Sequence, residues 1–219
     1  MFVPPAFRLD RAASLAFAAA RGFGLAVAHD GARPIASPVP FAIDYREDGT
    51  PLVQFHIARA NPLTRLAARG EVFLIAVSGA DAYVSPEWYV SPEQVPTWLY
   101  EAVHLTGAAK LIAPQDKARQ LDRLAERFDS GSGWTTERLS RGRLNAMLQA
   151  IVGVEVDVSE VEGKAKLNQN KSDADFAAVA ARLGGQPDPM AQQIAARMVA
   201  LRPDLSYETA AKEFEHGDY

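Results

Sequence analysis

The chain has 219 residues, of which 48% are hydrophobic and 23% charged, and its formal net charge is -4. These proportions are ordinary for a globular protein. The acidic balance argues against a dedicated nucleic-acid surface, which needs clustered Lys and Arg. No cysteine is present, so disulfides, thiolate metal ligands and cysteine nucleophiles are excluded. No apolar run approaches the ~20 residues that cross a bilayer, and the N-terminus lacks a convincing signal-peptide cleavage region, so we expect a cytoplasmic protein.

Three elements are predicted in the first part of the chain. Asp10 can cap a helix that ends at Gly22, since Asp is a favoured N-cap and Gly a favoured helix stop. Residues 23–29 alternate large and small side chains, which predicts a strand. A second strand is predicted over residues 34–43, and its two internal prolines limit it to a sheet edge or to an irregular pairing.

The next elements are a strand, a short helix and a second strand. Residues 52–58 alternate, with the apolar side chains on one parity and His56 on the other. Asn61 is expected to cap a helix that has Pro62 at its first position, where a missing N–H is tolerated. Residues 72–77 are apolar at every position, which predicts a buried central strand.

The remaining elements are a strand over 98–112, helices over 114–128 and within 134–151, a long strand or hairpin over 152–167, and alanine-rich helices from residue 172. The apolar parity of residues 152–167 flips near Ser159, and a bulge or turn there explains the flip. Strands therefore come in runs, and helices gather late in the chain. This order argues for an antiparallel barrel with peripheral helices and against a parallel doubly wound sheet.

Residues 83–104 concentrate two of the three tryptophans, three of the six tyrosines and three prolines. Aromatic rings offer a large contact area at low entropy cost, and proline stiffens the backbone. One interpretation is a flat, preformed binding surface. The other is a proline-rich connection that packs over a core, and composition alone leaves both open.

Motifs for common cofactor and catalytic chemistry are absent from the sequence. It contains neither GxGxxG nor GxxxxGK[ST], the usual phosphate-binding loops. His56 and His104 lie in predicted strands without a nearby ligand cluster, so we expect them to bond locally or to line a cavity and expect no metal. Ser85 and Ser91 precede prolines without an elbow motif, which makes a hydrolase a weak hypothesis.

Two polar segments could bind an anion. If the chain is extended after Gly163, residues Lys164, Lys166, Asn168 and Asn170 share one face, and two cations followed by amides make a phosphate cradle. A solvated strand edge explains the same pattern. The second segment is the turn at Arg59, where a strand leads into a helix N-terminus; its alternative is a surface arginine beside a helix cap.

Several stretches together resemble the PaiB family, whose members are described as FMN-binding negative transcriptional regulators. They are HIARANP at 56–62, AYVSPEWY at 82–89, VPTWLY at 95–100 with Val103 and His104, EGK at 162–164, KLNQN at 166–170, and the opening MFVPP with Phe7. The resemblance runs from residue 1 to about residue 185, and its motifs are long and ordered.

The resemblance implies an FMN-binding split β-barrel of antiparallel Greek-key type that dimerises and holds FMN at the subunit interface. It implies a flavin-binding barrel domain over 1–171 with inserted helices, and a helical extension over 172–219. Arg59 and the 166–170 segment would address the phosphate or ribityl oxygens, and His56 and His104 would point into the site or steady it. The implied cofactor-binding residues are His56, Arg59, Asn61, Tyr83, Ser85, Trp98, Lys166, Gln169 and Asn170.

The chain departs from the family pattern at three positions that bear on FMN affinity. Leu99 stands where the family commonly has Asn, which removes a polar group, and Asn168 and Lys171 stand where it commonly has Ser and Arg. Lys171 lacks the bidentate fork of arginine. Catalytic residues are not identified, and whether the protein is an enzyme stays open.

Two functions follow from the resemblance. The first is a flavin-linked negative transcriptional regulator, although DNA binding has little support from charge: Arg138, Arg141 and Arg143 are the one short basic run, and a solvated helix face explains it equally well. The alternative is a flavin-dependent oxidoreductase that acts on a small molecule without binding DNA, which rests on fold analogy.

Overall fold

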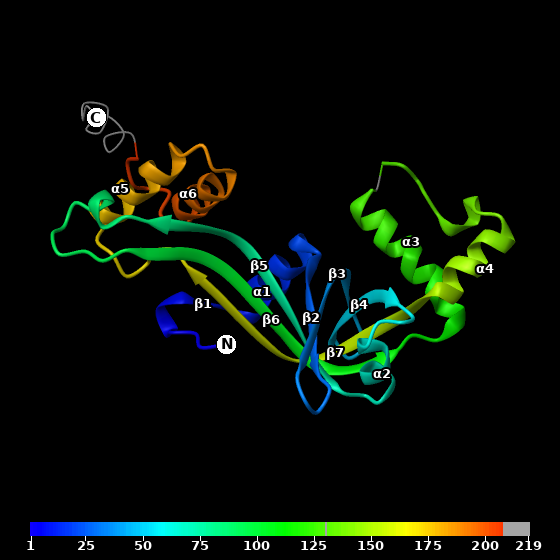
Figure 1. The fold of residues 1–219 in the computed structure, drawn as a ribbon. Helices are drawn as coiled ribbons and strands as arrows, with labels where there is room; N and C mark the ends of the chain where they lie inside the picture. Colours follow the sequence, from blue (N-terminus) through cyan, green and yellow to red (C-terminus); the bar gives the residue numbers. More distant parts are fainter. Residues whose placement is uncertain (130, 208–219) are drawn as a thin grey trace. The chain divides into compact units, whose positions relative to one another are not determined.

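The computed structural model describes residues 1–129 and 131–207 (Figure 1). Its strands are β1 (Arg8–Leu9), β2 (Phe23–His29), β3 (Pro34–Tyr45), β4 (Pro51–Ala58), β5 (Val72–Val84), β6 (Thr97–Leu111) and β7 (Ile151–Lys166). Its α-helices are α1 (Arg11–Arg21), α2 (Leu63–Ala68), α3 (Lys117–Phe128), α4 (Arg141–Ala150), α5 (Asp173–Gly184) and α6 (Pro189–Leu201). Short 3-10 helices are η1 (Pro5–Phe7), η2 (Pro86–Trp88), η3 (Pro114–Asp116) and η4 (Thr136–Arg138).

The strands form one sheet that closes on itself. Their order is β1-β7-β4-β3-β2-β5-β6, and β7 also pairs with β6. The six strands from β7 round to β6 therefore make a ring, and the pairings β2–β3, β2–β5, β3–β4 and β4–β7 are antiparallel. This confirms the antiparallel barrel with peripheral helices. No helix among the described residues is long and apolar enough to cross a membrane.

The chain divides into two compact units. The barrel unit consists of residues 11–77 and 103–162, and the platform unit consists of residues 1–10, 78–102 and the described residues from 163 on. Strands β5, β6 and β7 contribute a segment to each. The predicted division at residue 171 stays a prediction, and residues 208–219 of the predicted extension lie outside the described residues.

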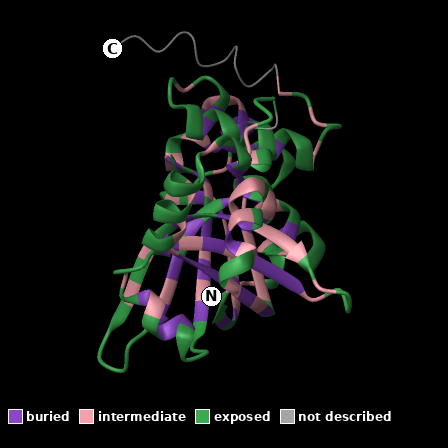
Figure 2. Cartoon of the chain, turned by 90° about the vertical axis from the view of Figure 1, so that its right-hand side faces the viewer, coloured by how far each residue is buried: buried purple, intermediate pink, exposed green. Residues whose placement is uncertain are grey.

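Alternation along the strands builds the core of the barrel unit. Val53, Phe55 and Ile57 of β4 are buried, while Gln54 and His56 between them are only partly so, as predicted. Figure 2 shows the same banding of buried and partly buried residues along the strands. Burial of such side chains is the main driving force of folding.

Two glycines mark sites that a side chain would disturb. Gly22 ends α1 with φ +58°, the left-handed region that glycine enters freely. At Gly107 of β6, a Cβ atom would lie 1.8 Å from the carbonyl oxygen of Asp157 on β7. The close approach of β6 and β7 that seals the barrel therefore requires glycine at this position.

The prolines of β3 are accommodated by one-sided pairing. Pro38 and Pro40 lie in the segment 34–40, which pairs with β2, whereas pairing with β4 begins at Phe41. β3 as a whole lies inside the sheet order, between β2 and β4. Residues 34–40 keep a regular register with β2. Since proline has no N–H to donate, this segment makes no ladder with β4 and is paired on one side only, as an edge strand is.

The structure corrects one strand prediction and decides between the two alternatives of another. Residues 72–77 are not buried on both faces, because Phe73, Ile75 and Val77 are buried while Val72 is exposed. The alternative of one long strand is confirmed over the hairpin, since β7 runs from Ile151 to Lys166, and the parity change occurs where Ser159 and Glu160 are both exposed. The change of parity near Ser159 is thus confirmed.

In the platform unit, α5 and α6 cover one face of the sheet. A single core joins strand residues to helix residues: Ala80, Ala82, Val84, Leu99, Ala165 and Leu167 pack with Phe176, Val179, Leu183, Ile194 and Met198, among others. The opposite face of these strand segments carries the alternate side chains. That uncovered face is the candidate site.

Candidate functional site

The candidate site lies on the uncovered face of the platform unit's strands, which we call the open face. It comprises Tyr83 of β5, Trp98 and Tyr100 of β6, and Lys164 and Lys166 of β7. These residues are exposed or half-buried, and their strand neighbours are buried. Because side chains alternate across a strand, the pattern that buries every second side chain in the core places the side chains between them on the open face.

Two aromatic rings form the centre of the open face. The rings of Tyr83 and Trp98 meet edge to face, with centroids 6.1 Å apart and planes at 70°, a preferred aromatic geometry. They stay 46% and 54% exposed, although rings of this size are usually well buried. An exposed, mutually fixed pair of rings can pack against a flat aromatic ligand.

Two ammonium groups lie beside these rings. Lys164 Nζ is 5.1 Å from the centroid of the Tyr100 ring, within cation–π range, and 3.5 Å from the carbonyl oxygen of Phe2. Lys166 Nζ donates a hydrogen bond to Oγ1 of Thr97, the residue before Trp98. The open face therefore offers positive charge next to an aromatic wall.

A cavity of about 310 Å³ adjoins Trp98. It is lined by Ser78, Gly79, Ala80, Asp81, Trp98, Tyr100, Glu101 and Ala102. The carboxylate of Glu101 is paired with Arg197, which leaves Asp81 as the exposed acid of the lining. The volume of this cavity is at the lower end of the range for small-molecule sites.

Residues 83–104 divide into an exposed part and a part that packs over the core. The second interpretation is confirmed for the buried part, and the binding surface stays a prediction. Tyr83 and Trp98 belong to the open face, while Tyr89 is buried and Trp88 packs against the core. Asp175 fastens the proline-rich loop to α5 by accepting hydrogen bonds of 2.9 Å from the backbone N–H groups of Val90 and Ser91.

Leu99 faces away from the open face. It is fully buried in the core shared with α5 and α6, so the residue that replaces the family's Asn is a core residue here. Lys171 Nζ lies 5.0 Å from the centroid of the Tyr89 ring. Tyr89 in turn donates to Oδ1 of the buried Asn168 at 3.3 Å.

The platform unit holds six of the nine predicted site residues, and three of these lie on the open face: Tyr83, Trp98 and Lys166. Ser85 caps η2 by accepting from the N–H of Glu87 at 3.3 Å. Asn170 is exposed.

The predicted extended face from Lys164 to Asn170 is wrong beyond Lys166. The strand ends there, and Asn168 has φ +61° and is buried, so the chain turns. Gln169 closes this turn, because its Nε2 donates to Ala165 O at 2.6 Å and its Oε1 accepts from Leu167 N at 2.7 Å.

The other three predicted residues belong to the barrel unit. Arg59 donates from Nε to Gln149 O at 2.6 Å and from Nη2 to Ile151 O at 3.3 Å, at the end of α4. Asn61 Oδ1 accepts from Leu63 N at 2.9 Å, as a helix cap does.

Two histidines of the barrel unit, His56 and His104, are partly buried. Burial lowers the pKa of His56, whose Nδ1 is buried without a hydrogen-bond partner in the described part of the chain. Burial also lowers the pKa of His104, and the Glu162 carboxylate, 4.0 Å away, opposes this. Both imidazoles are therefore neutral at pH 7.

Sequence reasoning placed Lys164 with Lys166 in the possible phosphate cradle but left it out of the cofactor-binding residues, and it overlooked Tyr100. The available signal was parity, since Tyr100 shares the parity of Trp98, and Lys164 that of Lys166. The described residues contain no group of three or more His, Asp or Glu that could hold a metal ion.

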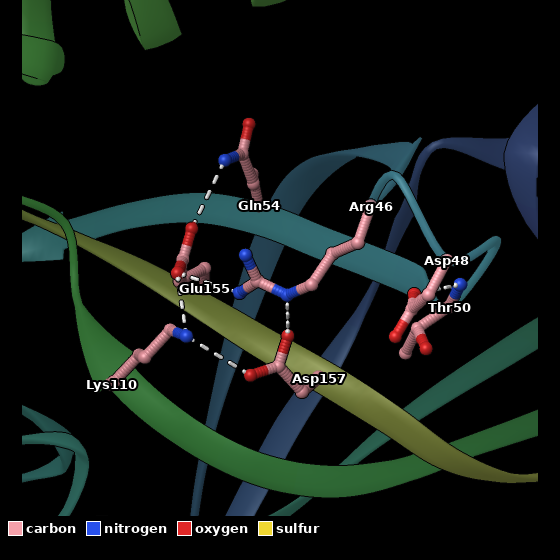
Figure 3. Close-up of polar contacts among 7 residues, drawn as sticks. All are labelled: Arg46, Asp48, Thr50, Gln54, Lys110, Glu155 and Asp157. Carbon is pink, nitrogen blue, oxygen red and sulfur yellow. Dashed lines mark hydrogen bonds and ion pairs between the residues drawn. The ribbon is translucent and has the colours of Figure 1, made fainter.

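Sequence reasoning also overlooked an ionic network on the barrel unit. Figure 3 shows Arg46 and Lys110 converging on the carboxylates of Glu155 and Asp157. Arg46 Nη2 lies 2.9 Å from Glu155 Oε1, and Lys110 Nζ lies 3.1 Å from Asp157 Oδ2. Its charges balance, so the network links strands and leaves no net charge for a ligand.

Comparison with known proteins gives one family and a set of structural neighbours. Residues 1–160 match the family model described as "Putative FMN-binding domain". The chain is 31% identical over 203 residues to "Protease synthase and sporulation protein PAI 2" of Bacillus subtilis, an alignment that covers 90% of this chain and 96% of that protein.

Two solved structures share the fold. An FAD and heme binding protein from Mycobacterium smegmatis superposes with a TM-score of 0.55 at 21% identity, covering 77% of this chain and 78% of that one. The flavocytochrome Anf3 from Azotobacter vinelandii superposes with a TM-score of 0.54 at 20% identity, covering 71% and 67%. The open face fits FMN, because its rings can pack on the isoalloxazine and its two ammonium groups can face the phosphate.

Proposed function

The chain belongs to the PaiB family of FMN-binding split-barrel proteins, and from this membership we propose that it is a homodimeric, flavin-linked regulator whose open face holds the cofactor. FMN is the cofactor, and when bound it supplies the redox chemistry and the absorbance in the visible range. The protein's own contribution is binding, orientation and electrostatics.

The single observation that carries the proposal is the pairing of exposed rings with cations on an uncovered sheet face. Tyr83 and Trp98 supply the wall for the flavin ring. Lys166, with Lys164 beside it, supplies positive charge for the phosphate. A planar, anionic ligand satisfies both features at once, whereas a neutral apolar ligand would leave the ammonium groups unused.

The same face supports a homodimer. Large exposed aromatic residues on a sheet face usually mark a contact surface, and a second copy that covers the open face would shield the flavin from water. His56, Arg59, Asn61, Ser85, Gln169 and Asn170 stay predicted cofactor contacts.

The regulatory part of the proposal rests on the relative from Bacillus subtilis, whose name refers to protease synthesis and sporulation. Direct DNA contact would need a basic surface. The exposed Arg138, Arg141 and Arg143 at η4 and the start of α4 are the predicted basic run. Three arginines on an acidic chain favour regulation through a partner or a small molecule over tight DNA binding.

The test combines a spectrum with a mass. Purified protein is titrated with FMN while absorbance and flavin fluorescence are followed, and its mass is measured by light scattering. We expect saturable uptake of one FMN per subunit and the mass of a dimer. Absence of uptake would contradict the cofactor site, and a monomer that still binds FMN would contradict the dimer alone. A mobility shift at physiological salt tests DNA binding separately.

A further inference from the structure

A second cavity lies in the barrel unit, between α3 and the strands β3 and β4. Its volume is about 320 Å³. It is lined by Ala42, Ile43, Asp44, Gln54, Arg123, Glu126 and Arg127. None of these residues belongs to the predicted flavin site, and the open face lies in the other unit. This cavity therefore needs an explanation of its own.

The charges of the lining are of two kinds. Arg123 Nη1 pairs with Asp44 Oδ2, so this pair is internally satisfied. Glu126 and Arg127 form no ion pair within residues 1–129 and 131–207. The cavity thus presents one carboxylate and one guanidinium that are free to meet a ligand carrying both complementary charges.

The exposed side chain of Arg127 packs against the ring of its neighbour Phe128. Its guanidinium carbon lies 5.6 Å from the centroid of the Phe128 ring. Gly22 leaves room for both side chains: a Cβ there would lie 2.7 Å from Cζ of Phe128 and 3.2 Å from Nε of Arg127. Since the ordering of a long side chain opposes binding, this packing favours recognition of an anion.

The uncharged residues that line the cavity are either apolar or hydrogen-bonded within the protein. Ala42 of β3, which is paired with Gln54 in the sheet, gives a small apolar floor. Gln54 is fixed by donating from Nε2 to Glu155 Oε2 at 3.3 Å, which ties it to the network of Figure 3. The floor suits a short aliphatic group, and the volume lies at the lower end for small-molecule sites.

From this arrangement we propose that the cavity binds a free α-amino acid with a short aliphatic side chain. Its carboxylate pairs with Arg127, its ammonium group pairs with Glu126, and its side chain lies on Ala42. An arginine fork matches carboxylate geometry. Glu126 and Arg127 are both exposed, so a ligand that lacks one of its two charges binds more weakly because it forms one ion pair and not two.

The test uses isothermal titration calorimetry on the full chain with L-leucine and L-valine. N-acetyl-L-leucine lacks the ammonium group, and L-leucinamide lacks the carboxylate. We expect saturable binding of at least one of the two amino acids, and at least tenfold weaker binding of both derivatives. Equal binding of a derivative, or no binding of either amino acid at millimolar concentration, would overturn the proposal.

Variants locate the site. R127Q and E126Q should each weaken binding at least tenfold, while R119Q, an exposed α3 residue that pairs with Asp116 at 3.3 Å, should leave it unchanged. Thermal unfolding followed by circular dichroism checks that all three variants fold. FMN uptake should be the same in all of them, so a failure here is distinct from a failure of the flavin site. Binding that survives both R127Q and E126Q would place the ligand elsewhere and refute the site.

Discussion

The guanidinium of Arg197 on α6 makes a bidentate ion pair with the carboxylate of Glu101 on β6. Nη2 lies 2.8 Å from Oε1, and Nε lies 3.1 Å and 3.2 Å from Oε1 and Oε2. Glu101 is only 4% exposed, and its hydrogen bonds raise the pKa of Arg197 against the opposing effect of burial. The pair ties α6 to the strand that carries Trp98 and Tyr100.

Removing the arginine should destabilise the protein more than removing the whole pair. R197M leaves the buried carboxylate of Glu101 without its partner, and we expect this to lower the free energy of unfolding by about 2 kcal/mol. The loss is smaller than for breaking a fully buried pair, because the arginine is half exposed. The double variant E101Q/R197M removes the stranded charge and should recover part of the loss. Urea denaturation measures both, and a double variant less stable than R197M would contradict this explanation.

Substitution on the open face should weaken FMN binding. W98A removes one of the two exposed rings and should raise the dissociation constant about tenfold, or about 1.4 kcal/mol. Fluorescence titration with FMN measures the effect. Y45A, which removes an exposed aromatic ring of the barrel unit, is the matched control and should bind FMN as the unaltered protein does.

The charge of Lys166 should matter most at low salt. K166Q removes an ammonium group beside the aromatic wall, and we expect several-fold weaker FMN binding at low ionic strength, with a smaller difference at high salt because ions screen the attraction. Repeating the FMN titration over a salt series measures this. A loss that does not change with salt would show that Lys166 acts through its structure and not its charge.

Introducing the family's Asn at position 99 should not improve the flavin site. Leu99 is fully buried against α5 and α6, so L99N places an amide in an apolar core and removes buried methyl groups. We expect a loss of about 3 kcal/mol of unfolding free energy and no tighter FMN binding. Tighter binding without loss of stability would mean that position 99 reaches the cofactor.

Acid should weaken the network of Figure 3. Burial raises the pKa of Asp157, but hydrogen bonds from Arg46 and Lys110 outweigh it and hold that pKa below the usual value. A lowered carboxyl pKa contributes stability above the unfolded-state value of about 3.9, and this is lost as the pH falls through the folded-state value. D157N should be less stable at pH 7 and should show a shallower loss of stability between about pH 5 and pH 2.

The burial of His56 predicts a second pH effect in a different range. Its lowered pKa means that the unfolded chain binds a proton more readily below about pH 6.5, so stability falls with acid in that range. H56L should flatten this fall, and a residual slope should remain because burial also lowers the pKa of His104. Replacement of the exposed His29 by Leu is the control, and denaturation between about pH 8 and pH 5 is the measurement.

Local patterns in the sequence were enough to predict most elements. The alternation in β2 and β4, the helix end at Gly22 and the parity change near Ser159 depend on residues a few positions apart. Such patterns decide which side chains share a face. The barrel class followed from the order of these elements, and the flavin followed from the resemblance, which the family match confirms.

Only the tertiary structure decided what each face and polar group meets. It covered the Leu99 face with α5 and α6 and left the Trp98 face open. In the structure Gln169 hydrogen-bonds within a turn, and Arg59 hydrogen-bonds to the end of α4. It also joined Arg46 to Asp157, 111 positions apart. Strand parity is a local property of the backbone, whereas the partner of a side chain depends on contacts between distant segments, which no local pattern contains.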